Sequence, residues 1–216
     1  MRKFKFVNGE IYHVYNRGVD KRSIFLEPSE SRRFLECLIH FNSVDPIESL
    51  YVHALRSPDE KAKLNSKKIV ELIAYCLNPN HFHLVIKQLK EGGISEFMKR
   101  LGGGYTNFFN ERHKRSGSLF QGTFKAKHIQ SNDHLLHLSA YVNLNDRVHK
   151  IKSPVVRTSY NEYRNYKASN QELCKPSIIL DQFKNIPEYL SFADNALDLM
   201  LEHKETVSDL NALTLE

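Results

Sequence analysis

The stretch 69-IVELIAYCLNPNHFHLVIK-87 decides the fold of this chain. Ile69–Leu77 is almost continuously apolar, which is typical of a central strand covered on both faces. Asn78-Pro79-Asn80 follows and predicts a turn, because asparagine tolerates left-handed backbone angles and proline fixes φ. His81–Lys87 predicts the next strand. The two strands should therefore form a hairpin in the middle of a sheet.

Three more segments favour strands on either side of this hairpin. Glu10–Tyr15 alternates between strand-forming side chains, and Leu119–Gln130 has a similar character. The polar segment between residues 42 and 68 leaves room for a short strand at Leu50–Leu55. With these segments, the sheet would be largely antiparallel.

Helical periodicity predicts the covering elements. Ser31–Phe41 carries its apolar residues on one face, and Leu135–Leu144 follows the N-cap candidates at residues 131–133. Ile94–Leu101 and Tyr105–Lys114 also favour helices, with Gly102–Gly104 interrupting them. The order of elements predicts an α+β fold with helices packed on an antiparallel sheet.

The 216 residues suit one domain with an appendage. We expect a catalytic-type domain over residues 1–150 and a C-terminal extension over residues 151–216, with one or two short helices beyond Pro154. Hydrophobic residues make up 41%, enough for a packed core. The three cysteines are widely spaced, which argues against a disulfide framework and against a cysteine-based zinc site.

Charge is distributed unevenly along the chain. From residue 170 onward there are nine acidic and three basic side chains, so this region carries −6. The net charge is +6, which leaves +12 in residues 1–169 and favours a polyanion such as nucleic acid as partner over a merely solubilising surface. Apolar runs are too short to span a membrane, and no secretory signal follows the basic start, so we expect a cytoplasmic protein without a membrane partner.

His81 and His83 lie one residue apart in a predicted strand. Side chains alternate between the faces of a strand, so the two imidazoles should share one face while Phe82 points into the core. Two imidazoles can share a metal ion, but a third ligand must come from elsewhere. An isolated pair of this kind is more often a polar surface feature; the turn and the long apolar strand before it favour a metal site here.

Tyr141 and Asn145 lie four residues apart and should be neighbours on a helix. The phenol can act as a nucleophile, and the amide oxygen is a neutral ligand suited to a divalent cation. By itself the pair is weak, since a helical tyrosine is usually a core residue and an asparagine near a helix end is usually a cap. Tyr105 is a rival nucleophile, ranked lower because Phe109 lies four residues on.

Taken together, these motifs resemble the HUH single-tyrosine transposases, and further stretches resemble one branch, the REP-associated tyrosine transposases (RAYTs). The resemblance covers roughly residues 5–166 and is specific as an ordered set. Its additional pieces are Tyr12-His13-Val14-Tyr15-Asn16-Arg17-Gly18 with Phe25, Tyr75-Cys76-Leu77 before the turn, Ser116-Gly117-Ser118-Leu119-Phe120-Gln121-Gly122 with Phe124-Lys125, and Ser159-Tyr160-Asn161-Glu162-Tyr163.

The resemblance implies a ferredoxin-like antiparallel sheet with helices packed on it, the HUH endonuclease fold; the helical C-terminal extension is expected from the residues beyond Pro154 instead. It implies His81, His83 and Asn145 as metal ligands and Tyr141 as the nucleophile. The expected reaction cleaves single-stranded DNA, often beside a hairpin, and leaves a 5′-phosphotyrosine and a free 3′-OH for strand transfer. Family members act as monomers or as domain-sharing homodimers, and both states stay open here. Asp146 departs from the pattern, in which proline commonly follows the asparagine.

Mg²⁺ is the usual metal in phosphate chemistry, whereas two imidazoles suit Mn²⁺ better, so both are candidates. Cations can neutralise a DNA backbone and aromatic side chains between them can stack on bases, although most of these aromatics should be core. The basic candidates are Arg17, Lys21, Arg22, Lys99, Arg100, Arg112, Lys114, Arg115, Lys125 and Lys127, and the interleaved aromatics are Tyr105, Phe108, Phe109, Phe120 and Phe124.

Three alternatives stay open. The chain could bind a DNA hairpin without cleaving it, as a regulator. A replication initiator or relaxase is less favoured, because relaxases carry the tyrosine before the HUH pair. A ribonuclease fits the charge but not single-tyrosine chemistry, which needs no 2′-OH. Further metal-ligand candidates, with DNA-facing or solvated side chains as the more probable alternative, are His113, His128, His134 and His137.

Overall fold

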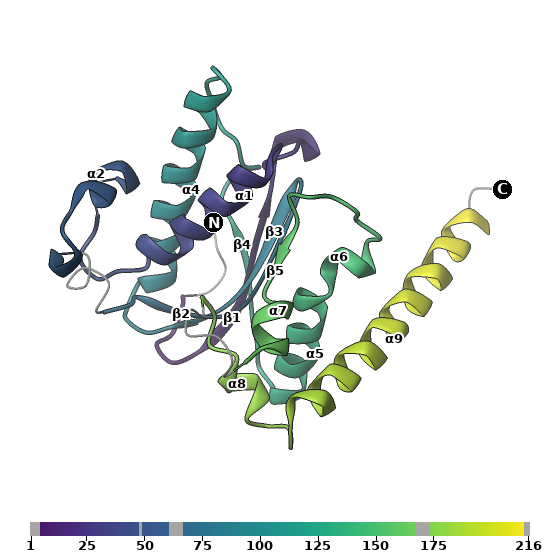
Figure 1. The fold of residues 1–216 in the computed structure, drawn as a ribbon. Coiled ribbons are helices and arrows are strands. Elements are labelled where there is room, and N and C mark those ends of the chain that lie inside the picture. The colour runs from purple at the N-terminus through teal and green to yellow at the C-terminus, as the bar shows by residue number, and fades with distance from the viewer. Residues whose placement is uncertain (1–4, 48, 61–66, 167–172, 214–216) are drawn as a thin grey trace.

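The computed structural model describes residues 5–47, 49–60, 67–166 and 173–213. It is an α+β fold built on one antiparallel sheet with helices on both faces (Figure 1), as the sequence predicts. The strands are β1 (Ile11–Arg17), β2 (Val70–Asn78), β3 (His81–Gln88), β4 (Lys125–His128) and β5 (Arg157–Thr158). The helices are α1 (Pro28–His40), α2 (Leu50–Leu55), α4 (Gly93–Arg112), α5 (Asn132–Asn143), α6 (Asn145–Val148), α7 (Tyr160–Arg164), α8 (Ser177–Leu180) and α9 (Ile186–Leu213), with a 3₁₀ turn η1 (Val19–Lys21).

The β2–β3 hairpin lies within the sheet as predicted. The strand order is β4-β1-β3-β2-β5, and every neighbouring pair is antiparallel. β2 is buried along nearly its whole length, which is the reason for its apolar sequence. β5 follows the expected domain boundary at residue 150 and pairs with β2, so residues on both sides of that boundary contribute to the sheet.

Each face of the sheet has its own core (Figure 1). On one face, α1 and α4 cover an aromatic cluster that includes Phe25, Phe34, Phe82 and Tyr105. On the other face, Ile73 and Val85 of the sheet pack with Leu135, Leu138 and Val142 of α5, and α7, α8 and α9 complete this largely aliphatic cluster. The α5 face is where the candidate residues gather. Within the described residues, none of the helices combines the length and apolar character needed to cross a membrane.

Two predicted elements are wrong in type or extent. Leu50–Leu55 forms helix α2 instead of a strand, because Ser49 caps it by accepting a hydrogen bond from the Val52 amide at 3.1 Å. The predicted strand over Leu119–Gln130 is regular only at Lys125–His128. Before it, Phe120 forms only an isolated bridge with Gly18, and Gly122, with φ of 66°, turns the chain before the regular pairing with β1 begins.

Two helices are longer than predicted. Gly102–Gly104 does not interrupt α4, which is continuous; Phe97, Leu101, Tyr105 and Phe109 recur every four residues along its buried side. Their packing outweighs the low helix propensity of glycine. The extension ends in one long helix, α9, whose Tyr189, Ala193 and Ala196 are buried on the α5 side of the molecule.

Candidate active site

His81 and His83 share the α5 face of β3, as predicted from strand alternation. Their ring centroids lie 5.2 Å apart with the planes nearly perpendicular, at 86°. Phe82 between them points to the opposite face and enters the aromatic cluster. His81 is half-buried at the turn, while His83 is 9% exposed. The two imidazoles therefore stand at the edge of the core with limited access to solvent.

Tyr141 approaches these histidines from α5. Its ring lies edge-on to His83, with centroids 5.7 Å apart and planes at 78°. Between Tyr141 and Asn145 the regular helix ends, because Leu144 adopts φ of −112° and α6 begins after it. Burial raises the pKa of Tyr141, and the neighbouring Asn145 amide acts in the opposite direction. The phenol needs assistance to ionise near neutral pH.

Asn78, the last residue of β2, joins two of the predicted ligands. Its Nδ2 donates to Asn145 Oδ1 at 2.6 Å and to His81 Nε2 at 3.0 Å. Asn78 Oδ1 and Asn145 Nδ2 are buried without a partner among the described residues. Asn145 Oδ1 and His81 Nε2 thus both point their lone pairs at Nδ2 of Asn78. Two other polar atoms of the same cluster have no hydrogen bond to a described residue. Convergent acceptors of this kind are what a cation site requires.

Contacts behind the two imidazoles fix their ring positions. His81 Nδ1 donates to Asn80 Oδ1 at 2.7 Å, which leaves His81 Nε2 with its lone pair on the Asn145 side. His83 Nδ1 lies 2.8 Å from Nε2 of His13 on β1. Burial lowers the pKa of His83 well below its usual value, and that of His81 is also lowered. Both rings are therefore neutral near pH 7, the form in which imidazole binds metals.

The family model described as "Transposase IS200 like" matches residues 56–145. This segment, less than half of the chain, is similar to IS200-like transposases. It contains all four predicted site residues, His81, His83, Tyr141 and Asn145. The resemblance expected from the sequence is thereby confirmed over this part of the chain.

A solved structure described as "Structure of the REP associates tyrosine transposase bound to a REP hairpin" is also similar. It shares 15% sequence identity and a TM-score of 0.48, over 81% of this chain and 93% of that chain. None of the curated proteins matches this chain.

Outside the matched segment, Arg17 at the end of β1 and Lys21 in η1 are two cations beside the histidines. Arg17 and Lys21 line a hollow of about 370 Å³ together with His81, His83 and Lys125. Arg17 donates to Gln121 across this hollow. Lys125 comes from β4, where it pairs in register with Tyr15. Three of the predicted DNA-binding cations thus lie directly beside the candidate metal ligands.

Other predicted cations are engaged within the protein. Arg100 forms an ion pair with Glu96 and donates to the Ser43 carbonyl at 2.5 Å. Arg112 pairs with Glu27 and with the fully buried Glu30. These contacts join α4 to α1 and to the loop that follows it. Both arginines thus have partners within the protein, and a DNA role for them stays a prediction.

The remaining predicted cations lie at loops or on exposed helix positions. Arg115 donates to Asn110 and Ser118, and its guanidinium lies 5.8 Å from the Phe109 ring. Arg22 lies 3.8 Å from Asp20. Lys114 and Lys99 are exposed. A DNA role for these residues stays a prediction.

The rival candidates have other partners or are exposed. The Tyr105 hydroxyl is buried in the aromatic cluster, where it donates to the Ile24 carbonyl at 2.7 Å. His113 contacts Glu30, and His128 lies 2.7 Å from Glu10. His137 lies 3.7 Å from Asp133, and His134 is exposed. Within the described residues, no three His, Cys, Asp or Glu side chains form a metal-binding group.

Sequence reasoning missed three residues of the site. Asn78 and Asn80 were assigned to a turn, although their side chains contact Asn145 and His81. His13 was noticed only within the family motif. One signal could have identified it: on β1, His13 and Tyr15 alternate with apolar residues and so share a face, just as His81 and His83 do.

Proposed function

We propose that this protein is a metal-dependent endonuclease and strand transferase for single-stranded DNA, with Tyr141 as its nucleophile. One observation carries the proposal: the Tyr141 ring lies against His83 while Asn145, four residues on, shares the Asn78 amide with His81. A tyrosine packed only for stability would not need polar acceptors converging beside it. The match of residues 56–145 to IS200-like transposases supports the same chemistry.

The reaction exchanges one phosphate ester for another. The Tyr141 oxygen forms a bond to phosphorus as its proton is lost, and the bond from phosphorus to the 3′ oxygen breaks. The departing 3′ oxygen takes up a proton, which leaves a 5′-phosphotyrosine and a free 3′-OH. Because the new ester retains the bond energy, a second 3′-OH can reverse the step and join strands.

His81, His83 and Asn145 fit a divalent ion. All three are neutral ligands, two of them nitrogens, and this set suits Mn²⁺ at least as well as Mg²⁺. Such an ion supplies positive charge to the scissile phosphate. Asn80 and His13 hold the two rings in place from behind. Arg17, Lys21 and Lys125 neutralise phosphates as the strand enters the hollow.

A second candidate function is a hairpin-binding regulator of the same fold that does not cleave. The burial of Tyr141 and its raised pKa favour this candidate, since they oppose ionisation of the phenol. The two functions differ in whether a covalent protein–DNA species forms.

A covalent adduct assay separates the two functions. Labelled DNA with a hairpin and single-stranded flanks is incubated with Mn²⁺ or Mg²⁺ and resolved on a denaturing protein gel. We expect a shifted band for the wild type and for Tyr105→Phe, and at least a 1000-fold loss of it in Tyr141→Phe. Tyr105→Phe is the matched control because it also removes one phenol oxygen from a helix. Tight binding without any covalent band, with either metal, would establish the regulator instead.

A further inference from the structure

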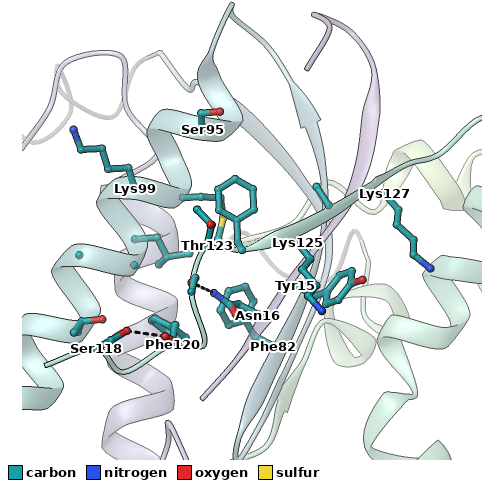
Figure 2. A pocket seen from close by; sticks show the side chains of 18 residues that line it. Tyr15, Asn16, Phe82, Ser95, Lys99, Ser118, Phe120, Thr123, Lys125 and Lys127 are labelled. Atoms are coloured by element: carbon teal, nitrogen blue, oxygen red, sulfur yellow. Dashed lines mark hydrogen bonds between the residues drawn. The ribbon is translucent and has the colours of Figure 1, made fainter. Parts of the chain in front are cut away.

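A line of cross-strand pairs runs through the sheet at His83. Cys76 of β2 pairs with His83, and His83 pairs in turn with Tyr15 of β1. Tyr15 pairs with Lys125 of β4, the strand at the edge of the sheet. Residues directly opposite each other on antiparallel strands share a face, so all four side chains lie on the α5 face. Figure 2 shows Tyr15 and Lys125 on the same side of the sheet, opposite to Asn16.

Tyr141 approaches this line from its β2 end. The helix that carries Tyr141 packs on β2 and β3. Burial raises the pKa of Tyr141, and the Cys76 thiol of β2 adds to this shift, which places the phenol near β2. Its ring lies edge-on to His83. Tyr141 therefore lies on the β2 side of His83.

Lys125 lies at the other end of the line. Neighbouring strands are about 4.8 Å apart, so β4 lies roughly 10 Å from β3, with β1 between them. Lysine has a flexible four-carbon stem, and Lys125 lines the hollow that contains His81 and His83. Tyr141 and Lys125 thus approach His83 from opposite directions.

This arrangement matches the demands of an in-line displacement at phosphorus. In such a reaction, the attacking and departing oxygens lie on opposite sides of phosphorus. When Tyr141 attacks a phosphate held beside His83, the 3′ oxygen departs on the side of β1 and β4. This oxygen leaves with a pair of electrons, and a proton supplied at that moment lowers the barrier.

Lys125 is the cation in position to supply this proton. Arg17 also lines the hollow, but it donates to Gln121, and a guanidinium does not lose its proton in proteins. Lys21 belongs to η1, beyond the end of β1, and so lies off the line of cross-strand pairs. Among the described residues that line the hollow, none is acidic, so no carboxylate there competes for the Lys125 ammonium.

We propose that Lys125 is the general acid of strand cleavage and protonates the departing 3′ oxygen. The bond from the Tyr141 oxygen to phosphorus forms as the phenol proton passes to water, and the bond from phosphorus to the 3′ oxygen breaks. The electron pair stays on the 3′ oxygen, which takes a proton from the Lys125 ammonium. Lys125 is left as a neutral amine and accepts the proton of a 3′-OH in the reverse, joining step. This role rests on the proposed function, which supplies the reaction.

Replacing the departing oxygen by sulfur tests this role. DNA with a 3′ sulfur in the scissile linkage releases a thiolate, a much weaker base than an alkoxide, which leaves without a proton. Adduct formation is followed with Mn²⁺ in a single turnover at saturating DNA, so that weaker binding does not lower the measured rate. Lys125→Met removes the charge and should slow adduct formation at least about 100-fold on ordinary DNA. On the sulfur-linked DNA, its rate should equal that of the wild type.

Lys127→Met is the matched control. Lys127 lies on the same strand and face, in register with His13, but it does not line the hollow. Any loss of rate in this variant should be the same on both DNAs. Tyr15→Phe removes the neighbouring hydroxyl and should likewise show no restoration by sulfur.

Three results would overturn the role of Lys125. These are an unchanged rate of Lys125→Met on ordinary DNA, a loss that sulfur does not restore, and restoration by sulfur in Tyr15→Phe instead. In each case, a covalent band that depends on Tyr141 would leave the cleavage function standing. The absence of any covalent band in the wild type, with either DNA, would overturn both the cleavage function and its acid.

Discussion

Tyr105 and Tyr141 lie on helices that cover opposite faces of the same sheet, and their surroundings differ throughout. Tyr105 on α4 is surrounded by Phe25, Phe34 and Phe109, and its hydroxyl donates to a backbone carbonyl. Tyr141 on α5 is half-buried beside a histidine. A tyrosine whose hydroxyl is satisfied inside an aromatic core serves stability. One placed beside convergent polar groups can serve chemistry.

Alanine substitutions should show the largest difference in stability between the two tyrosines. We expect Tyr105→Ala to lower the free energy of unfolding by about 3–5 kcal/mol, because it leaves a large cavity in the aromatic cluster. Tyr141→Ala should cost less than half as much, since its ring is only partly buried. Urea unfolding of both variants measures the difference. Equal losses would mean that Tyr141 is as much a core residue as Tyr105.

High pH should lower the free energy of unfolding through Tyr189 of α9, which is buried on the α5 side of the sheet. Burial raises the pKa of Tyr189 to about 12, and its hydroxyl accepts from Asn143 Nδ2 at 2.8 Å. Because the folded-state pKa exceeds the usual value near 10, the unfolded chain releases this proton first. Tyr189 makes its full contribution to the free energy of unfolding below pH 10. This contribution, about 3 kcal/mol in all, is lost as the pH rises toward 12.

Urea midpoints at pH 9 and pH 11.5 measure this loss. Tyr189→Phe removes the titrating group and should show a smaller decrease between the two pH values than the wild type. Tyr160 raises the pKa of Tyr189 in addition to burial, whereas Ser139 and Asn143 oppose the shift. The same decrease in both proteins would assign the loss to other buried groups, such as Cys37 on the α1 side, whose pKa is also raised to about 12.

His13 should raise the metal affinity of the candidate site through its contact with His83. We expect His13→Ala to weaken Mn²⁺ binding about 10- to 100-fold. In the wild type, His13 Nε2 lies 2.8 Å from His83 Nδ1 and the two rings are stacked, so His13 fixes the orientation of the His83 ring. Isothermal titration with Mn²⁺ measures the affinity. His128→Ala on the neighbouring strand is the control, since His128 contacts Glu10 instead. Unchanged Mn²⁺ affinity in His13→Ala would show that His83 needs no support from β1.

Sequence patterns predicted the parts of this molecule that depend on local periodicity. Strand alternation places His81 and His83 on one face, and the i, i+4 spacing brings Asn145 near Tyr141 even though the helix breaks at Leu144. These relations are short in sequence and are set by backbone geometry.

Relations across long sequence distances were not predictable in the same way. The contact between Asn78 and Asn145 joins residues 67 positions apart, and that between His13 and His83 joins residues 70 apart. Both depend on the strand order and on how α5 and α6 pack on the sheet. The continuity of α4 was missed for a related reason: its buried side chains, which outweigh three glycines, can be judged only with their partners in place.

The smallest expected effects concern two neighbouring glycines of α4, the helix that carries Tyr105. Gly103→Ala should raise the free energy of unfolding by about 1 kcal/mol, because alanine stabilises a helix interior and its Cβ meets open space. Gly104→Ala, one residue on, should instead lower it by about 1–3 kcal/mol, since its Cβ would press against the buried Phe41 ring. Urea unfolding of the two variants, identical in chemistry, should therefore give opposite signs. If both changes stabilise the protein, the Phe41 ring can move aside and Gly104 is not required for packing. If both destabilise it, the open space beside Gly103 is filled in solution by the protein itself.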